Sequence, residues 1–393
     1  MTSTETPTFE LADESPATMD EGMALCLSGG GYRAMLFHAG AILRLNELGL
    51  LNSFRRISSV SGGSITAAVL GMEWKQLGWN SSNGLVMADS NALMNNVVGP
   101  LRKMASTSID ASSIFWGTVN PFKSISDEVA GKYDDVLFDH KTLQDLPSDS
   151  EGPRFVLNAT NVKTGSLWRF SKPYIADYRV GMIENPTVSL AQVVTASSAF
   201  PPVLSPMCLK LDPRAFKSGI PAHDVDPGLR ENAVLTDGGV YDNLGLETAW
   251  KRYKTILISD AGRKMDDDLN PATDWAMHSR RLIDLLQHQT SNLRRRQAIE
   301  AFQSQQDPHD GTYFGIQTDI SDFQIGNCLP CPHPKTLAIA YIPTRLTALK
   351  PTDQERIINW GYAVTDASVR KYIPQCQASP PPQHFPYPMT ALG

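Results

Sequence analysis

The chain has 393 residues, of which 41% are hydrophobic and 19% are charged, as in an ordinary globular protein. Its net charge of −6 implies no broad basic face, which argues against a nucleic-acid partner. No stretch approaches the roughly 20 continuous apolar residues of a membrane-spanning helix, so we expect any membrane contact to be peripheral. The five cysteines are sparse and odd in number, which favours a reducing compartment and a cytoplasmic location.

The predicted organisation is one large domain, residues 22–373, between two tails. Residues 1–21 are polar and acidic and lack the basic start and apolar centre of a signal peptide, so we expect a disordered tail. Residues 374–393 are rich in proline and predict an extended or loose tail. One domain is favoured over two because three motifs, spread over residues 29–239, must meet to form one site.

The first predicted strand, Ala24–Leu27, runs directly into a glycine-rich turn, Ser28–Arg33, before a helix predicted over Ala34–Leu48. The consecutive glycines of this turn let backbone N–H groups converge on an anion with no Cβ in the way. The turn could hold a dinucleotide pyrophosphate, but no clear acidic strand end follows about 20 residues later, and the Gly-Lys-Ser/Thr of a P-loop is missing. An oxyanion hole beside a nucleophile fits this turn better.

The second predicted strand, Arg56–Ser59, ends in the pentapeptide Ser59-Val60-Ser61-Gly62-Gly63, and a helix is predicted directly after it. A serine between small residues at a strand-to-helix turn is typical of a nucleophile elbow, although Ser59 replaces the usual first glycine while Gly63 keeps the second. Ser61 would project its hydroxyl at a helix N-terminus, where backbone N–H groups favour a developing negative charge. A plain glycine- and serine-rich turn is the alternative interpretation of these five residues.

A third motif follows the predicted strand Ala233–Leu235 and reads Thr-Asp-Gly-Gly over residues 236–239. Asp237 would lie at the C-terminal end of this strand, the edge at which ligands gather in open α/β sheets. By itself the segment is better explained as an ordinary Asp-Gly turn. Its meaning therefore depends on the other two motifs.

Strand and helix patterns alternate along the rest of the chain, which indicates a parallel or mixed sheet with helices on both faces. Further strands are predicted at Phe155–Asn158, Thr255–Ser259 and Tyr313–Gln317. Further helices are predicted at Ser64–Met72, Leu190–Ser197, Leu246–Tyr253, Trp275–Phe302 and Asp353–Tyr372. The long helix near residues 275–302 carries Trp275, Leu282, Leu286 and Leu293 on one stripe. Its run Arg294-Arg295-Arg296 is either a solvated helix face, which we favour, or an anionic-lipid contact.

Two apolar stretches are candidates for the mouth of a site. Residues 106–125 carry Ile114-Phe115-Trp116 among small polar residues and could form a mobile cap, although we favour a loop whose aromatic side chains dock on the core. The segment Phe200–Leu204 could line an acyl groove, where its prolines leave few N–H groups to satisfy in apolar surroundings.

One arrangement of residues, Cys328-x-x-Cys331 followed by His333, could hold zinc. No second pair of ligands is evident, so a proline-rich loop with incidental thiols is favoured. The D-x-D-x-D-G pattern of a calcium loop is missing as well. We therefore expect no metal in the site.

Taken together, the glycine-rich turn with its arginine, the elbow and the Asp-Gly-Gly motif resemble, in this order, the patatin-like phospholipases. The run Gly-Gly-Gly-Tyr-Arg-Ala-Met is also similar to the group IV cytosolic phospholipases, and Ala199-Phe200-Pro201-Pro202 is similar to a stretch of bacterial patatin-like proteins. The resemblance covers roughly residues 22–372. Ser28 departs from the usual aspartate, and Ser59 and Ala34 from glycine, but none of these changes removes a reactive group.

The resemblance implies a three-layer α/β/α fold with a central, mostly parallel sheet and a Ser-Asp dyad. It makes Ser61 the nucleophile and Asp237 its base. The oxyanion loop would be Gly29, Gly30 and Gly31, with N–H donors from Gly30 and Gly31 and with Gly29 shaping the loop. Arg33 would steady this loop or the anionic substrate. The remaining motif residues are Ser59, Gly63, Gly238 and Gly239. A histidine base would follow Asp237 in the chain, but the candidates lack a catalytic loop context: His278, His288, His309, His333 and His384. His38, near the glycine-rich turn, is expected to pack within its helix.

The predicted function is therefore a phospholipase A-type lipid acyl hydrolase that needs no metal or organic cofactor. Its expected partners are a phospholipid or another acyl ester, met at a membrane or micelle surface, and its oligomeric state stays open. A thioesterase or general carboxylesterase is one alternative. A lipid-binding scaffold with little turnover is another, although such a protein need not keep Ser61, Asp237 and the glycines together.

Overall fold

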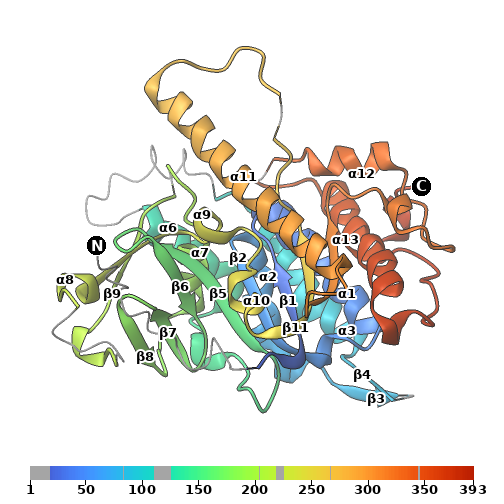
Figure 1. Cartoon of the computed structure of the whole chain (residues 1–393), viewed down its shortest axis with the longest axis horizontal. Helices are drawn as coiled ribbons and strands as arrows, with labels where there is room; N and C mark the ends of the chain where they lie inside the picture. Colours follow the sequence, from blue (N-terminus) through green and yellow to red (C-terminus); the bar gives the residue numbers. More distant parts are fainter. Residues whose placement is uncertain are drawn as a thin grey trace.

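The computed structural model describes residues 18–393 apart from residues 83, 110–124, 203, 218–224, 266 and 344–345. The expected cap around Ile114-Phe115-Trp116 and nearly all of the expected N-terminal tail lie outside the described residues. A central sheet with helices on both of its faces organises the part of the chain that is described (Figure 1).

The sheet has ten strands within the described residues and is parallel at its centre. The parallel strands are, in spatial order, β12 (Asp310–Gly315), β11 (Tyr253–Asp260), β1 (Asp20–Leu27), β2 (Phe54–Val60) and β5 (Arg154–Asn161). The antiparallel strands are β6 (Ser166–Phe170), β7 (Tyr174–Asp177) and β8 (Gly181–Glu184), which extend the sheet from β5, and β10 (Asn232–Asp237) with its partner β9 (Met207–Lys210). A separate hairpin joins β3 (Asn80–Ser82) and β4 (Leu85–Met87).

The helices of the described chain are α1 (Gly31–Glu47), α2 (Gly62–Glu73), α3 (Ser90–Leu93), α4 (Gly99–Ala105), α6 (Ile125–Tyr133), α7 (Leu190–Ser197), α8 (Gly228–Glu231), α9 (Gly239–Asp242), α10 (Glu247–Trp250), α11 (Trp275–Gln303), α12 (His333–Ala340) and α13 (Pro351–Tyr372). Five-residue π-helical turns, Met94–Val98 and Asp134–Phe138, interrupt this regular pattern. Among the described helices, none combines the length and apolarity that a membrane span requires.

Side chains of the central strands alternate between two hydrophobic cores. On β1, Leu25 and Leu27 belong to the larger core, which lies beneath α1, α2, α7 and α13. Ala24 and Cys26 point to the opposite face and pack in a smaller core with residues of α10 and with Ala298 of α11. Strands that are buried on both faces are typical of a sheet between two helical layers. The expected three-layer arrangement with a mostly parallel central sheet is confirmed.

Most predicted elements lie where the sequence patterns put them, and α7 has the predicted bounds. The helix predicted over Leu246–Tyr253 is wrong in its second half, because α10 ends at Trp250 and β11 begins at Tyr253. The pairing of Tyr253 with Asp20 on β1 starts the strand there and outweighs local helix propensity.

The C-terminal segment is not the loose tail that its composition predicts. Phe385 and Leu392 are buried in the larger core, and the Asn359 side chain of α13 donates to the carbonyl groups of Tyr387 and Thr390 over 2.9 Å and 3.2 Å. Apolar side chains spaced among the prolines thus anchor the segment on α13.

Close helix packing fixes the position of α1, whose N-terminus carries the glycine-rich turn. α1 and α13 cross at two glycines: a Cβ on Gly40 would lie 2.0 Å from the Ile358 carbonyl oxygen, and a Cβ on Gly361 would lie 2.0 Å from that of Phe37. Only glycine allows the two backbones to approach so closely. The turn at the start of α1 is therefore held by a helix that cannot shift easily.

Candidate active site

Two strands meet end to end along one edge of β5, and this brings two of the predicted motifs together. β2 runs parallel to β5 until Val60 pairs with Asn158, whereas β10 runs antiparallel to β5 until Asp237 pairs with Ala159. β6 pairs with the other edge of β5 over these residues, so β2 and β10 share one edge of β5. The C-terminal ends of β2 and β10 therefore point toward each other along that edge. Asp237 does end its strand, as predicted, but it meets Ser61 because the strand is antiparallel and not through the edge of a parallel sheet.

Ser61 occupies the sharp turn between β2 and α2 in a strained backbone conformation, with φ 51° and ψ −119°. The two following residues leave no room for a side chain. A Cβ on Gly62 would lie 2.1 Å from the Gly31 carbonyl oxygen, and a Cβ on Gly63 would lie 2.5 Å from that of Leu27. The chain therefore makes the sharp turn that the pentapeptide predicts, and the glycine-rich turn packs directly against it.

A buried cluster of hydroxyl groups supports this turn. The Ser61 N–H donates to Ser197 Oγ over 3.0 Å, and Ser197 Oγ donates to the Asn158 carbonyl over 2.7 Å. Ser64 Oγ lies 2.9 Å from Ser197 Oγ and 3.0 Å from Ser59 Oγ, so Ser59 has a hydrogen-bonding place in the core. Sequence reasoning missed Ser197, since no local signal marks the last residue of α7 as the partner of a turn 136 residues away.

The carboxyl group of Asp237 is buried and receives a hydrogen bond from the Ser61 side chain, with 2% of the residue exposed. The Gly239 N–H donates to Asp237 Oδ1 over 2.7 Å, and the backbone N–H of Asp237 donates to the Ala199 carbonyl over 2.9 Å. Gly238 packs so closely on β5 that a Cβ there would lie 2.4 Å from a strand carbonyl oxygen. Burial raises the pKa of Asp237 to about 7, although the hydrogen bonds from Gly239 and Ser61 lower it. A carboxyl group with this pKa can accept or donate a proton near neutral pH.

The glycine-rich turn lies between β1 and α1, beside Ser61. A Cβ on Gly29 would lie 3.2 Å from Ser61 Cβ, and the Gly29 N–H is already used because it donates to the Asn243 carbonyl over 3.0 Å. Gly30 has φ 144° and Gly31 has φ 59°, a region that favours glycine. Gly31 begins α1, and the first N–H groups of a helix have no partner within it. The N–H groups of Gly30 and Gly31 are therefore the candidates for binding an oxyanion.

Arg33 is fully buried in the first turn of α1 and contacts backbone carbonyl groups. Its guanidinium donates to Ala261 over 2.8 Å, to Ala340 over 2.6 Å and to Ile342 over 2.7 Å. Burial lowers the pKa of Arg33 to about 10, although the nearby Asp260 carboxylate raises it. These contacts join the glycine-rich turn to the segments that follow β11 and α12. Contacts of this kind suit a residue that steadies the loop, which is one of the two roles expected for Arg33.

His38 is fully buried in α1 below the same turn. Its Nε2 lies 2.9 Å from the Ser28 carbonyl and therefore donates, so that Nδ1 accepts from the Ser259 hydroxyl over 2.8 Å. Burial lowers the pKa of His38 to about 4, and the ring is neutral at pH 7. The later histidines that hydrogen-bond within the described chain do so away from the elbow: His288 with Asn292, His309 with Asp307 and Trp250, and His384 with Phe385.

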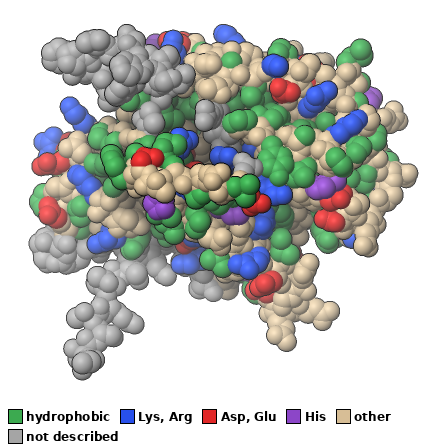
Figure 2. Space-filling model, turned by 90° about the horizontal axis from the view of Figure 1, so that it is seen from above, with side chains coloured by type: hydrophobic (Ala, Val, Ile, Leu, Met, Phe, Trp, Pro, Cys, Tyr) green, Lys and Arg blue, Asp and Glu red, His purple; other side chains and the backbone are tan. Residues whose placement is uncertain are grey.

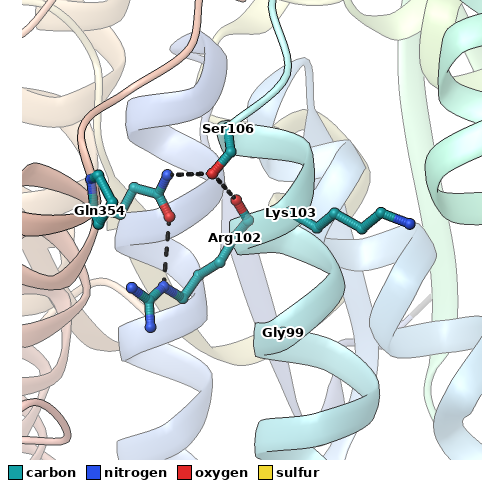
Figure 3. Close-up of a pocket in the computed structure, with 6 residues that line it drawn as sticks. Gly99, Arg102, Lys103, Ser106 and Gln354 are labelled. Carbon is teal, nitrogen blue, oxygen red and sulfur yellow. Dashed lines mark hydrogen bonds between the residues drawn. The ribbon is translucent and has the colours of Figure 1, made fainter.

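One cavity away from Ser61 could mark another site. A cavity of about 300 Å³ lies between α4 and α13, lined by Gly99, Arg102, Lys103, Ser106, Pro351 and Gln354 (Figure 3). Arg102 pairs there with Glu355 over 2.7 Å, which balances its charge. The described residues contain no cluster of three or more His, Cys, Asp or Glu side chains that could hold a metal ion, the Cys328, Cys331 and His333 segment included.

The sequence matches the family model described as patatin-like phospholipase over residues 25–250, which is more than half of the chain. The protein therefore belongs to the patatin-like phospholipase family. The matched region contains all three motifs of the candidate site. A comparison of the sequence with curated proteins found no match.

Solved structures of similar fold include human GIVD cytosolic phospholipase A2, with 14% identity and a TM-score of 0.53 over 88% of this chain and 59% of that chain. The same human enzyme in complex with methyl gamma-linolenyl fluorophosphonate has 15% identity and a TM-score of 0.49 over 90% and 58% of the two chains. VipD from Legionella pneumophila has 14% identity and a TM-score of 0.37 over 88% and 66%. The first likeness confirms the fold, and this chain spans about three fifths of that structure's length.

Proposed function

We propose that this protein is a lipid acyl hydrolase of the phospholipase A type, which cleaves fatty-acyl esters with Ser61 as nucleophile and Asp237 as base. The observation that carries the proposal is the buried Asp237 carboxyl group beside the hydroxyl of a serine on a strained strand-to-helix turn. Family membership supports the lipid substrate class. The site chemistry supports ester hydrolysis through an acyl-enzyme intermediate.

In the acylation step, Ser61 Oγ attacks the ester carbonyl carbon while Asp237 accepts the hydroxyl proton. A carboxylate is usually a weak base, but a pKa of about 7 makes Asp237 more basic and still leaves about half of it ionised at pH 7. The N–H groups of Gly30 and Gly31 stabilise the oxyanion, and losing one such donor typically lowers turnover about 100-fold to 1,000-fold. Asp237 then gives its proton to the leaving alcohol, and the ester C–O bond breaks.

In the deacylation step, water attacks the acyl carbon of the Ser61 ester while Asp237 accepts a proton from that water. Asp237 returns the proton to Ser61 Oγ as the C–O bond to the fatty acid breaks, which restores the starting site. Arg33 acts as a positioning residue in this proposal, because it holds the glycine-rich turn through backbone carbonyl groups. Besides the ester and water, each of these steps uses side chains and backbone of the protein.

The alternative functions are a hydrolase that applies the same residues to another substrate and a binding protein that needs none of them. A thioesterase or general carboxylesterase would share the Ser61 and Asp237 chemistry and differ in its acyl carrier. A lipid-binding scaffold is less favoured, because binding requires neither the strained turn at Ser61 nor a desolvated carboxyl group beside it. We also propose that the protein meets its substrate at a membrane or micelle surface in the cytoplasm.

Mass spectrometry of a total lipid extract, after incubation with wild type and with Ser61→Ala, tests the proposal. We expect free fatty acids and lysophospholipids with the wild type only, and a fluorophosphonate probe should label the peptide that contains Ser61. Equal product with Ser61→Ala, or a label on another residue of an active preparation, would reject Ser61 as nucleophile. A panel of phospholipids, acyl-CoAs and short esters then separates the phospholipase from the two related hydrolases.

A further inference from the structure

The long helix α11 stands away from the body of the molecule over its N-terminal half (Figure 1). Residues 275–279 are all exposed, and Asp274 caps the helix by accepting from the Met277 N–H over 3.0 Å. The buried residues of α11, Ala298 and Ala301, lie in its last two turns. The helix is therefore anchored at one end, and the other end extends into solvent.

The projecting part carries large apolar side chains on the side that faces away from the protein. Trp275 is 84% exposed, Leu282 45%, Leu286 65% and Leu293 59%. At 3.6 residues per turn these four lie within about 20° of one line along the helix, and about 140° around the helix from Ala298. We call them the outward stripe. A row of large apolar side chains in contact with water is a feature of an interaction surface.

Positive charges outnumber negative charges on α11. The helix holds five arginines, at positions 280, 281, 294, 295 and 296, against two acidic residues, Asp284 and Glu300. Asp284 lies about 180° from the outward stripe, and the exposed Arg296 lies about 60° from it. The exposed Glu300 lies about 20° from the line of the stripe, in the last turns of the helix where α11 is anchored. Arg294 pairs with Glu247 over 3.0 Å and Arg295 lies over the Tyr313 ring, so Arg296 is the exposed arginine of this run. An apolar stripe that includes tryptophan, with arginine beside it, is typical of helices that bind anionic lipid. Figure 2 shows the molecule from the side on which α11 projects, and on this face hydrophobic, basic, acidic and histidine side chains are interspersed.

The inner side of α11 rests on the candidate active site. Gln287 Nε2 lies 2.5 Å from the position that a Cβ on Gly239 would take, and the Gly239 N–H donates to the Asp237 carboxyl group. A helix is about 10–12 Å across with its side chains. A flat surface in contact with the outward stripe would therefore come within about one helix diameter of the Asp-Gly-Gly turn.

We propose that the outward stripe of α11 docks the protein on the surface of an anionic phospholipid bilayer. The choice of a lipid partner rests on the proposed function, since the stripe lies on the back of the helix that covers the site. Docking inserts Trp275 and the three leucines among the lipids, and Arg296 contacts anionic headgroups. A second copy of the chain, paired through the same stripe, is the competing occupant.

Co-sedimentation with vesicles tests the proposal, with the full chain carrying Ser61→Ala so that the lipid stays intact. The vesicles are phosphatidylcholine with and without phosphatidylserine. The triple change Trp275→Ser, Leu282→Ser and Leu286→Ser should weaken binding at least about tenfold, as loss of several buried apolar side chains predicts. The matched control changes exposed apolar residues elsewhere: Leu85→Ser, Val162→Ser and Met389→Ser. This control should bind as before, and Arg296→Gln should lose about fivefold on the phosphatidylserine vesicles only.

Equal vesicle binding by the stripe variant and the control variant would overturn the proposal. Light scattering gives a second outcome that would overturn the proposal: a wild-type dimer that becomes monomeric in the stripe variant while vesicle binding is unchanged. In that case a second copy of the chain would occupy the stripe. Thermal unfolding checks that both triple variants fold. With Ser61 restored, the stripe variant should keep its hydrolysis of a soluble ester and lose hydrolysis of vesicle phospholipid. A wild type that binds vesicles but hydrolyses neither substrate rejects the proposed function and leaves the docking surface standing.

Discussion

Asp237→Asn removes the proposed base but keeps the size of the side chain and an oxygen that can accept from the Gly239 N–H. Because the base works only as a carboxylate and its pKa is about 7, wild-type kcat/KM should rise with pH and level off above about pH 7. Each pH unit below the pKa lowers the carboxylate fraction about tenfold, so activity at pH 5 should be about 1% of the plateau. A pH profile with a soluble short-chain ester measures this, and the variant should lose nearly all hydrolysis.

The same pKa predicts a change in folding stability of the opposite sign. Burial raises the pKa of Asp237 from 3.8 to about 7, because the folded protein favours the neutral carboxyl group. The free energy of unfolding therefore falls as the pH rises from about 3.8 through about 7, where the buried carboxyl group becomes charged. A shift of about 3 units corresponds to about 4 kcal/mol of unfolding free energy. Asn does not ionise, so urea unfolding should show Asp237→Asn gaining stability relative to wild type between pH 5 and pH 8. A flat wild-type activity profile together with an unchanged stability difference would refute this reasoning.

Three further substitutions test the surroundings of the site. Ser197→Ala removes the acceptor of the Ser61 N–H, so we expect a loss of about 1–3 kcal/mol in urea unfolding and a lower kcat, whereas the neighbouring Ser198→Ala should keep kcat near wild type. Gly361→Val puts side-chain atoms within 2.0 Å of a backbone carbonyl oxygen of α1, so thermal unfolding should show a loss of about 2 kcal/mol or more, or no folded protein. His288→Ala should retain most ester hydrolysis; a folded but inactive variant would mean that a histidine completes a triad.

The sequence by itself determined the local parts of this protein. The strand-turn-helix units around Ser61 and around the glycine-rich turn were predictable, because sharp turns need residues without large side chains at particular positions. The bounds of α7 and the apolar stripe of α11 follow from helical periodicity in the same way. Asp237 was predicted as the base from the resemblance to a family, since an Asp-Gly turn is common in any chain.

Tertiary structure decided how these local units meet. β10 lies antiparallel on β5, directly ahead of β2, and this long-range register is what puts Asp237 beside Ser61. The pKa of Asp237 depends on burial by segments distant in sequence, as does the hydrogen bond from the Ser61 backbone to Ser197. The periodicity of α11 likewise predicts an apolar stripe but not whether it is buried or exposed, because the same pattern occurs on both kinds of helix face. Contacts between distant segments leave no local pattern in the sequence, and only the packed chain shows them.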